Sequence, residues 1–179
     1  MAEWLRGGDP GRLATFVASC TERMAQLFTG LRGGDPSRAE DVELYLEVLE
    51  ELWSPDLAGN VFAARIEALQ EFAELQPSEE GLVAVVDIYA FYGVLCMRYA
   101  VLCRATGDAE NAVRCAHACL TAMGQLDRNI SQASFFEGEH EYQRRMMLDA
   151  VAGFGSHLQL RNSDRDVSRE RLLAVNSRL

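Results

Sequence analysis

The stretch LVAVVDIYAFYGVLCMRYAVLCR, residues Leu82–Arg104, decides the fold, because it is apolar on nearly every side of a helix. A helix without a polar face is typical of an element that other helices surround. The segment TGDAEN (Thr106–Asn111) follows, in which Gly107 is suited to end one helix and Asp108 to cap the next. An alanine-rich helical pattern then continues to about Leu126. We therefore predict a buried central helical hairpin.

The segments on both sides of this hairpin are amphipathic. Their apolar side chains recur at steps of three and four, the period of an α-helix, within residues 13–28, 42–53, 62–72, 131–158 and from about 164. No alternating pattern of the kind that predicts a β-strand is present in the sequence. Residues 1–179 are therefore expected to form one all-α domain, a bundle of six or seven helices around the central hairpin.

Two near-copies of one octapeptide, LRGGDPGR from Leu5 and LRGGDPSR from Leu31, mark helix boundaries. In each copy the aspartate is suited to cap a helix, and the proline after it to occupy the first helical position. Neither copy carries the glycine spacing of a phosphate-binding loop. Helices are therefore expected to begin at Asp9–Pro10 and at Asp35–Pro36.

Other boundary signals stand at both ends of the longer helical segments. Ser78, with Glu79 and Glu80 after it, is suited to cap the first helix of the hairpin. Gly153 and Gly155 are expected to loosen the segment 131–158, because glycine inside a helix is unfavourable.

The charge of the chain restricts the class of partner. Seventeen basic residues against 27 acidic ones give a net charge of −10, which argues against binding to nucleic acid or an anionic membrane and favours a basic protein. The start MAEWLRGG does not resemble a secretory signal, and five cysteines without a spacing pattern suit reduced thiols in the cytoplasm. Asp87 and Arg98 make Leu82–Arg104 a poorer candidate for a membrane span than for a buried helix.

One face of the helix predicted at 42–53 is strongly acidic, and no basic residue lies between Ala39 and Pro55. We predict that this face is an interaction surface, formed by Glu40, Glu43, Glu47, Glu50 and Glu51.

Asp87 and Arg98 are polar residues on the helix predicted to be most buried. They stand ~16 Å apart along the axis, too far to pair, so each needs a partner from another helix. Gln125 and Arg128 lie at the right level for Asp87 in a hairpin. The two interpretations are a structural polar tie and a ligand pocket, the latter lined by Asp87, Tyr89, Tyr92, Arg98 and Tyr99.

Two sets of residues are candidate metal ligands. Cys96, Cys115 and Cys119 are predicted to approach one another across the hairpin, but their helical spacing favours thiols that pack in the core. Glu137, His140 and Glu141 share one helix face, yet a di-iron bundle needs a second Glu-x-x-His pair, which the sequence lacks. We expect a solvated face with a Glu141–Arg145 pair, no metal and no cofactor.

Three stretches carry a family resemblance: ATFVASCTERMAQLFTGL from Ala14, YLEVLEELWSP from Tyr45, and the hairpin sequence from Val85 to Met123. Residues 13–151 resemble the YjaG-like bacterial domain of unknown function. The similar features are a Cys-x-Glu-Arg-Met helix start, a Leu-Trp helix end, and an apolar helix followed by an alanine-rich one. The resemblance implies a compact, all-helical cytoplasmic protein. It brings no established reaction and no catalytic residues.

A catalytic signature is missing, since the chain has no G-x-S-x-G elbow and its three histidines lack obvious acidic partners. We therefore expect a non-catalytic acidic helical protein-interaction module, and an immunity- or antitoxin-like role against a basic toxin is one concrete form. The alternative is an enzyme or small-ligand binder with a pocket between the central helices near Asp87. A homo-oligomer is compatible with both.

Overall fold

A computed structural model describes residues 2–77, 84–130, 132–152 and 157–178, and it confirms the predicted all-α bundle. No strand occurs in these ranges. The α-helices are α1 (Ala2–Arg6), α2 (Pro10–Met24), α3 (Gln26–Arg32), α4 (Ala39–Leu52), α5 (Gly59–Gln70), α6 (Val85–Thr106), α7 (Ala109–Asn129), α8 (Phe135–Ala152) and α9 (His157–Asn176). Single 3-10 turns, η1 and η2, occupy Pro36–Arg38 and Ala73–Leu75.

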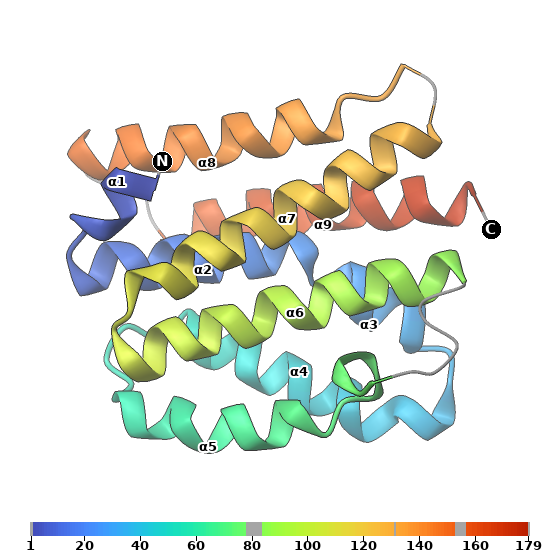
Figure 1. The fold of residues 1–179 in the computed structure, drawn as a ribbon, viewed down its shortest axis with the longest axis horizontal. Coiled ribbons are helices and arrows are strands. Elements are labelled where there is room, and N and C mark those ends of the chain that lie inside the picture. Colours follow the sequence, from blue (N-terminus) through green and yellow to red (C-terminus); the bar gives the residue numbers. More distant parts are fainter. Residues whose placement is uncertain (1, 78–83, 131, 153–156, 179) are drawn as a thin grey trace.

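The α6–α7 hairpin lies at the centre of the molecule, as predicted. Gly107 has a left-handed backbone (φ 69°) and ends α6, and the Asp108 carboxylate accepts the Glu110 N–H at the start of α7. Helix α8 runs along one edge and α5 along the other, with α2 and the hairpin between them (Figure 1). Helix α6 packs against α2, α3, α5 and α7, and α9 packs against α2 and α3.

Both octapeptides are helix boundaries, as predicted. Asp9 accepts a hydrogen bond from the Arg12 N–H, with Pro10 in the first turn of α2. Asp35 accepts hydrogen bonds from the N–H and the hydroxyl of Ser37, which starts the turn that leads into α4. The proposed cap at Ser78 and the glycines Gly153 and Gly155 lie outside the described residues.

The segment 13–28 does not form one helix. The helix is interrupted at Ala25, which separates α2 from α3. Two side chains of α9 bond the backbone groups at this break. The Ser168 hydroxyl accepts the Gln26 N–H at 2.9 Å, and Arg171 donates to the Arg23 carbonyl at 3.3 Å. Helix α9 itself begins at His157, earlier than the residue 164 predicted, and is twenty residues long.

Candidate functional site

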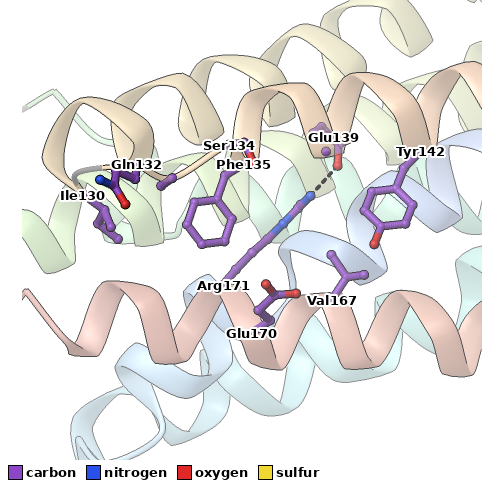
Figure 2. A pocket seen from close by; sticks show the side chains of 11 residues that line it. Ile130, Gln132, Ser134, Phe135, Glu139, Tyr142, Val167, Glu170 and Arg171 are labelled. Carbon is purple, nitrogen blue, oxygen red and sulfur yellow. Dashed lines mark hydrogen bonds and ion pairs between the residues drawn. The ribbon is translucent and has the colours of Figure 1, made fainter.

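An open pocket of about 440 Å³ lies between α8 and α9, and residues of the connection from α7 line one end of it (Figure 2). We call it the α8–α9 pocket. Its lining residues come from three segments: Ile130, Gln132, Ala133, Ser134 and Phe135 at the connection, Gly138, Glu139 and Tyr142 on α8, and Val167, Glu170 and Arg171 on α9. The lining combines apolar walls with a few polar groups, as small-molecule sites commonly do.

The floor of this pocket is the fully buried carboxylate of Glu139. Its Oε2 accepts hydrogen bonds from Arg23 Nε at 2.9 Å and Arg171 Nη2 at 2.5 Å. Its Oε1 accepts from Arg23 Nη2 at 2.8 Å and from Gln143 Nε2 at 2.7 Å. Burial alone would raise the pKa of Glu139, but the two guanidinium charges and their hydrogen bonds lower it to about 2.

Arg23 connects this carboxylate to a second one. Its Nη1 donates to Asp164 Oδ1 at 3.0 Å and to the Ser19 hydroxyl at 2.6 Å, and Ser19 donates in turn to Asp164 Oδ2 at 2.6 Å. Burial raises the pKa of Asp164. We call these groups the buried ionic cluster: Arg23, Glu139, Asp164 and Arg171. The cluster links α2, α8 and α9, and it has no net charge when all four groups are ionised.

The cysteines meet beside this cluster, and the predicted approach of three thiols is confirmed. Cys96 Sγ lies 3.3 Å from both Cys115 Sγ and Cys119 Sγ. Cys20 lies next to them, with Arg23 Nη2 at 3.5 Å from its sulfur. Burial would raise the pKa of Cys96, but hydrogen bonds from the two neighbouring thiols lower it to about 6. All four thiols are completely buried.

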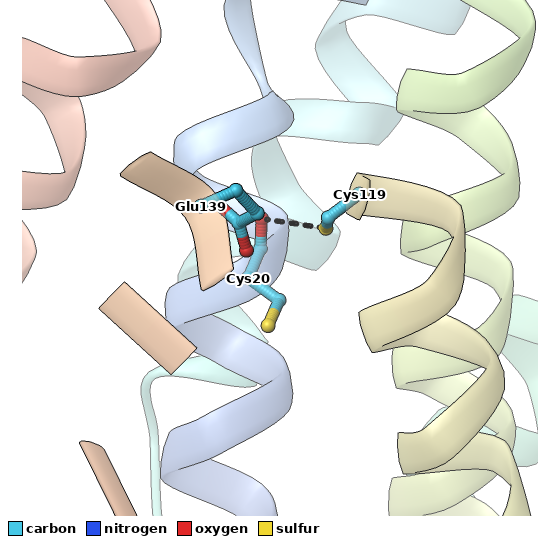
Figure 3. Close-up of side chains that lie close together, drawn as sticks. All are labelled: Cys20, Cys119 and Glu139. Atoms are coloured by element: carbon cyan, nitrogen blue, oxygen red, sulfur yellow. Dashed lines mark hydrogen bonds between the residues drawn. The ribbon is translucent and has the colours of Figure 1, made fainter. Parts of the chain in front are cut away.

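Two thiols and a carboxylate approach the arrangement of metal ligands. The sulfurs of Cys20 and Cys119 and a Glu139 oxygen lie within 4.8 Å of one another (Figure 3). Both Glu139 oxygens, however, already accept two hydrogen bonds each. A cation bound there would displace Arg23 or Arg171 and leave a buried charge unpaired, which is strongly unfavourable. The geometry therefore suits an ionic tie that packs against thiols.

The candidate ligands of a di-iron site lie outside the pocket, on the other face of α8. Glu137 and His140 are exposed. Glu141 forms the predicted ion pair with Arg145 at 3.0 Å, and a second pair with Arg144 at 2.8 Å. None of the three takes part in the α8–α9 pocket.

The acidic residues predicted as an interaction surface divide into two groups. Three of them form ion pairs within the chain: Glu47 and Glu51 with Arg65 of α5, and Glu50 with Arg161 and Arg165 of α9. Glu40 and Glu43 are exposed and form no ion pair within the described ranges. Much of the acidic side of α4 therefore holds neighbouring helices in place.

The five residues predicted as a pocket are not brought into one cavity. Asp87 pairs with Arg32 of α3 at 2.7 Å, so the predicted partners on α7 were wrong, and Tyr89 is buried in the core. Arg98 forms no ion pair with any described residue.

Tyr92 and Tyr99, in contrast, share a shallow groove of about 330 Å³ on the outer side of the hairpin. We call it the aromatic groove; it is lined by Phe91, Tyr92, Leu95 and Tyr99 of α6 and by Arg114, His117, Ala118 and Thr121 of α7.

Sequence reasoning missed the buried ionic cluster, although a signal was present. Ser19 and Arg23 interrupt the apolar stripe of α2 at helical spacing, and Glu139 and Gln143 do the same between Phe135 and Met146 on α8. Polar residues on two inward stripes indicate a buried polar contact.

No protein-family model matches the chain, and no match to a curated protein or to a solved structure was found.

Proposed function

We propose that this protein is a non-catalytic helical protein-interaction module, with the aromatic groove as its contact surface. The observation that carries the proposal is the incomplete burial of α6. This helix is long and apolar enough to cross a membrane, yet its side chains Phe91, Tyr92, Leu95 and Tyr99 are only half-buried within the chain. Apolar surface that the fold leaves uncovered is typical of an interaction site.

The composition of the groove supports the same function. Tyrosine and arginine are enriched among the residues that dominate binding energy at interfaces, and Tyr92, Tyr99 and Arg114 provide them here. The rings of Phe91 and Tyr92 pack edge to face with centroids 5.3 Å apart, and both residues belong to the central hairpin. A preorganised surface loses little conformational entropy when it binds.

The groove lacks the groups that catalysis would need. His117 lines it, but no carboxylate in the lining set can orient an imidazole, and Thr121 is its sole hydroxyl beside those of the tyrosines. Recognition by shape and aromatic contact is the chemistry that these residues support.

The proposal includes the partner and the compartment. A net charge of −10 favours a partner of basic overall charge, because complementary fields accelerate association. Five free thiols suit the reducing cytoplasm. An immunity- or antitoxin-like role, in which the chain neutralises a basic protein, is one concrete form of this function.

The experiment compares two variants with the wild type. The double change Tyr92→Asp and Tyr99→Asp places charge in the aromatic groove, and Leu173→Asp does so at an apolar side chain of α9 that is 69% exposed. Partners retained from the native cell extract are identified by mass spectrometry, purified and titrated by calorimetry, and light scattering reports self-association.

We expect the groove variant to bind at least about tenfold more weakly, since buried interface aromatics dominate affinity, and Leu173→Asp to bind like the wild type. Equal binding by all three proteins, or a wild type that retains no partner and stays monomeric, contradicts the proposal.

A further inference from the structure

We propose that the α8–α9 pocket binds a small organic cation, an alkylammonium or an alkylguanidinium, with its charge between the Glu170 carboxylate and the Tyr142 hydroxyl. Its carbon chain then lies against Phe135 and Val167. This site is separate from the aromatic groove and does not depend on the function proposed for it.

The charges that line the pocket favour a cation. Arg171 and Glu139 neutralise each other at the floor, and the oxygens of Glu139 are occupied by hydrogen bonds. Glu170 remains as an exposed carboxylate at the pocket wall, and it has no hydrogen bond or ion pair with any described residue. The net charge of the three charged lining residues is therefore −1. The unpaired negative charge belongs to Glu170, the exposed one of the three.

The walls offer the other contacts that such a ligand needs. Figure 2 shows Tyr142 and Val167 toward one end of the pocket, Phe135 toward the other, and Glu170 between them beside Arg171. One face of the Tyr142 ring is covered by Arg23, whose guanidinium carbon lies 5.5 Å from the ring centroid, while the Tyr142 hydroxyl has no hydrogen bond among the described residues. This hydroxyl can accept an ammonium N–H, and the Phe135 ring can cover the carbon chain.

An independent observation comes from Gly138, which lies inside α8 and lines the pocket. A Cβ atom built on Gly138 meets no heavy atom within 4 Å. No packing contact requires glycine here, although glycine inside a helix is unfavourable. Glycine therefore leaves this part of the pocket lining without a side chain, and a large residue there would narrow the pocket.

An anion could instead bind at the N-terminus of α8, but a carboxylate of the chain already occupies that position. The Asp127 carboxylate accepts the Phe135 N–H at 2.7 Å and the Phe136 N–H at 2.9 Å. The first free N–H groups of α8 are therefore capped from α7, and a bound anion would compete with a covalently tethered carboxylate.

The test is a titration of the full-length protein, followed by amide chemical shifts. The probes are agmatine and n-butylammonium, with n-butanol as the neutral analogue and butyrate as the anionic one. Glu170→Gln removes the charge with little change in shape, and Gly138→Leu fills the pocket. Glu137→Gln, an exposed carboxylate of α8 outside the pocket, is the matched control. A fifth probe, N-acetyl-arginine amide, represents a protein side chain.

We expect saturable binding of both cations with shifts at 134–142 and 167–171, and weaker or no binding of butanol and butyrate. Glu170→Gln should weaken binding about tenfold, because it removes a charge-assisted hydrogen bond. Gly138→Leu should abolish binding, and Glu137→Gln should leave it unchanged. Preference for agmatine over the arginine amide would indicate a free metabolite as ligand, and the reverse a partner's side chain; both support a cation site.

The proposal is overturned if neither cation binds the folded wild type, if butanol binds as well as butylammonium, or if Gly138→Leu binds normally. Circular dichroism and a melting curve verify that each variant is folded. Should Gly138→Leu fail to fold, Gly138→Ala takes its place, with partial loss of binding as the expected result. A failed titration leaves the aromatic groove untouched, since no residue is shared between the two sites.

Discussion

Arg23 and Glu139 form a two-pronged ion pair between α2 and α8, with nitrogen–oxygen distances of 2.8 and 2.9 Å and both side chains completely buried. Removing one partner of such a pair leaves an unpaired charge in the core. We expect Glu139→Gln to lower the free energy of unfolding by ~3–5 kcal/mol, as for other broken buried pairs. Urea unfolding measures this change. The control, Glu141→Gln, removes two ion pairs at the surface of the same helix. An equal loss in both variants would contradict the buried role.

The same pair predicts an acid-sensitive fold. The pKa of Glu139 falls from its ordinary 4.5 to about 2, so its ionised form stabilises the folded chain above pH 4.5, and this contribution is lost as the pH falls toward 2. Burial raises the pKa of Asp164, which offsets part of this loss. Unfolding free energies measured between pH 2 and pH 7 should therefore decrease steeply below about pH 4.5. A Glu139→Gln protein with the same slope in this window would argue against Glu139 as the cause.

The thiols should be protected by the fold in spite of the lowered pKa of Cys96. All five cysteines are buried and free, so a thiol reagent reaches them only when the chain opens. We expect no rapid reaction with a chromogenic disulfide in native protein, and five equivalents of thiol in denaturant. A thiol that reacts in the native protein as fast as free cysteine would show that the cluster is accessible.

Two glycines should respond in opposite ways to the same substitution. Gly138→Ala is expected to stabilise the fold by about 1 kcal/mol, because the added Cβ meets no atom and alanine is the better helix former. Gly93→Ala should destabilise it, since its Cβ would lie 3.2 Å from Phe28 in the contact of α6 with α3. Thermal melting of both variants provides the comparison. Destabilisation by Gly138→Ala would mean that the wall of the pocket is already in contact with other atoms.

Local sequence signals were sufficient for the helical class and for several helix boundaries. The apolar period, Gly107 and the two Asp-Pro pairs depend on neighbours within a few residues, and each marked a real helix or boundary. The break at Ala25 did not follow from local signals, because Ser168 and Arg171 supply its hydrogen bonds from more than 140 residues along the chain.

The sites were predicted less well, for a related reason. Tyr92 and Tyr99 are two helical turns apart, so spacing places them on one side of α6, but the groove that they share is completed by α7 and does not include Asp87. Glu139 could not be distinguished from Glu137 and Glu141 by type, since burial of a charge is decided by partners on other helices. The sequence therefore predicted the exposed face of α8, with its Glu141–Arg145 pair, but not the buried role of Glu139.

The most direct test of the central claim is hydroxyl-radical footprinting of the chain with and without its retained partner. We predict that Tyr92 and Tyr99 of the aromatic groove become protected, while Leu46, which is 46% exposed on α4 beside the acidic residues, keeps its reactivity. Protection of Leu46 with unchanged reactivity of both tyrosines would contradict this prediction and would indicate that the contact surface lies on α4.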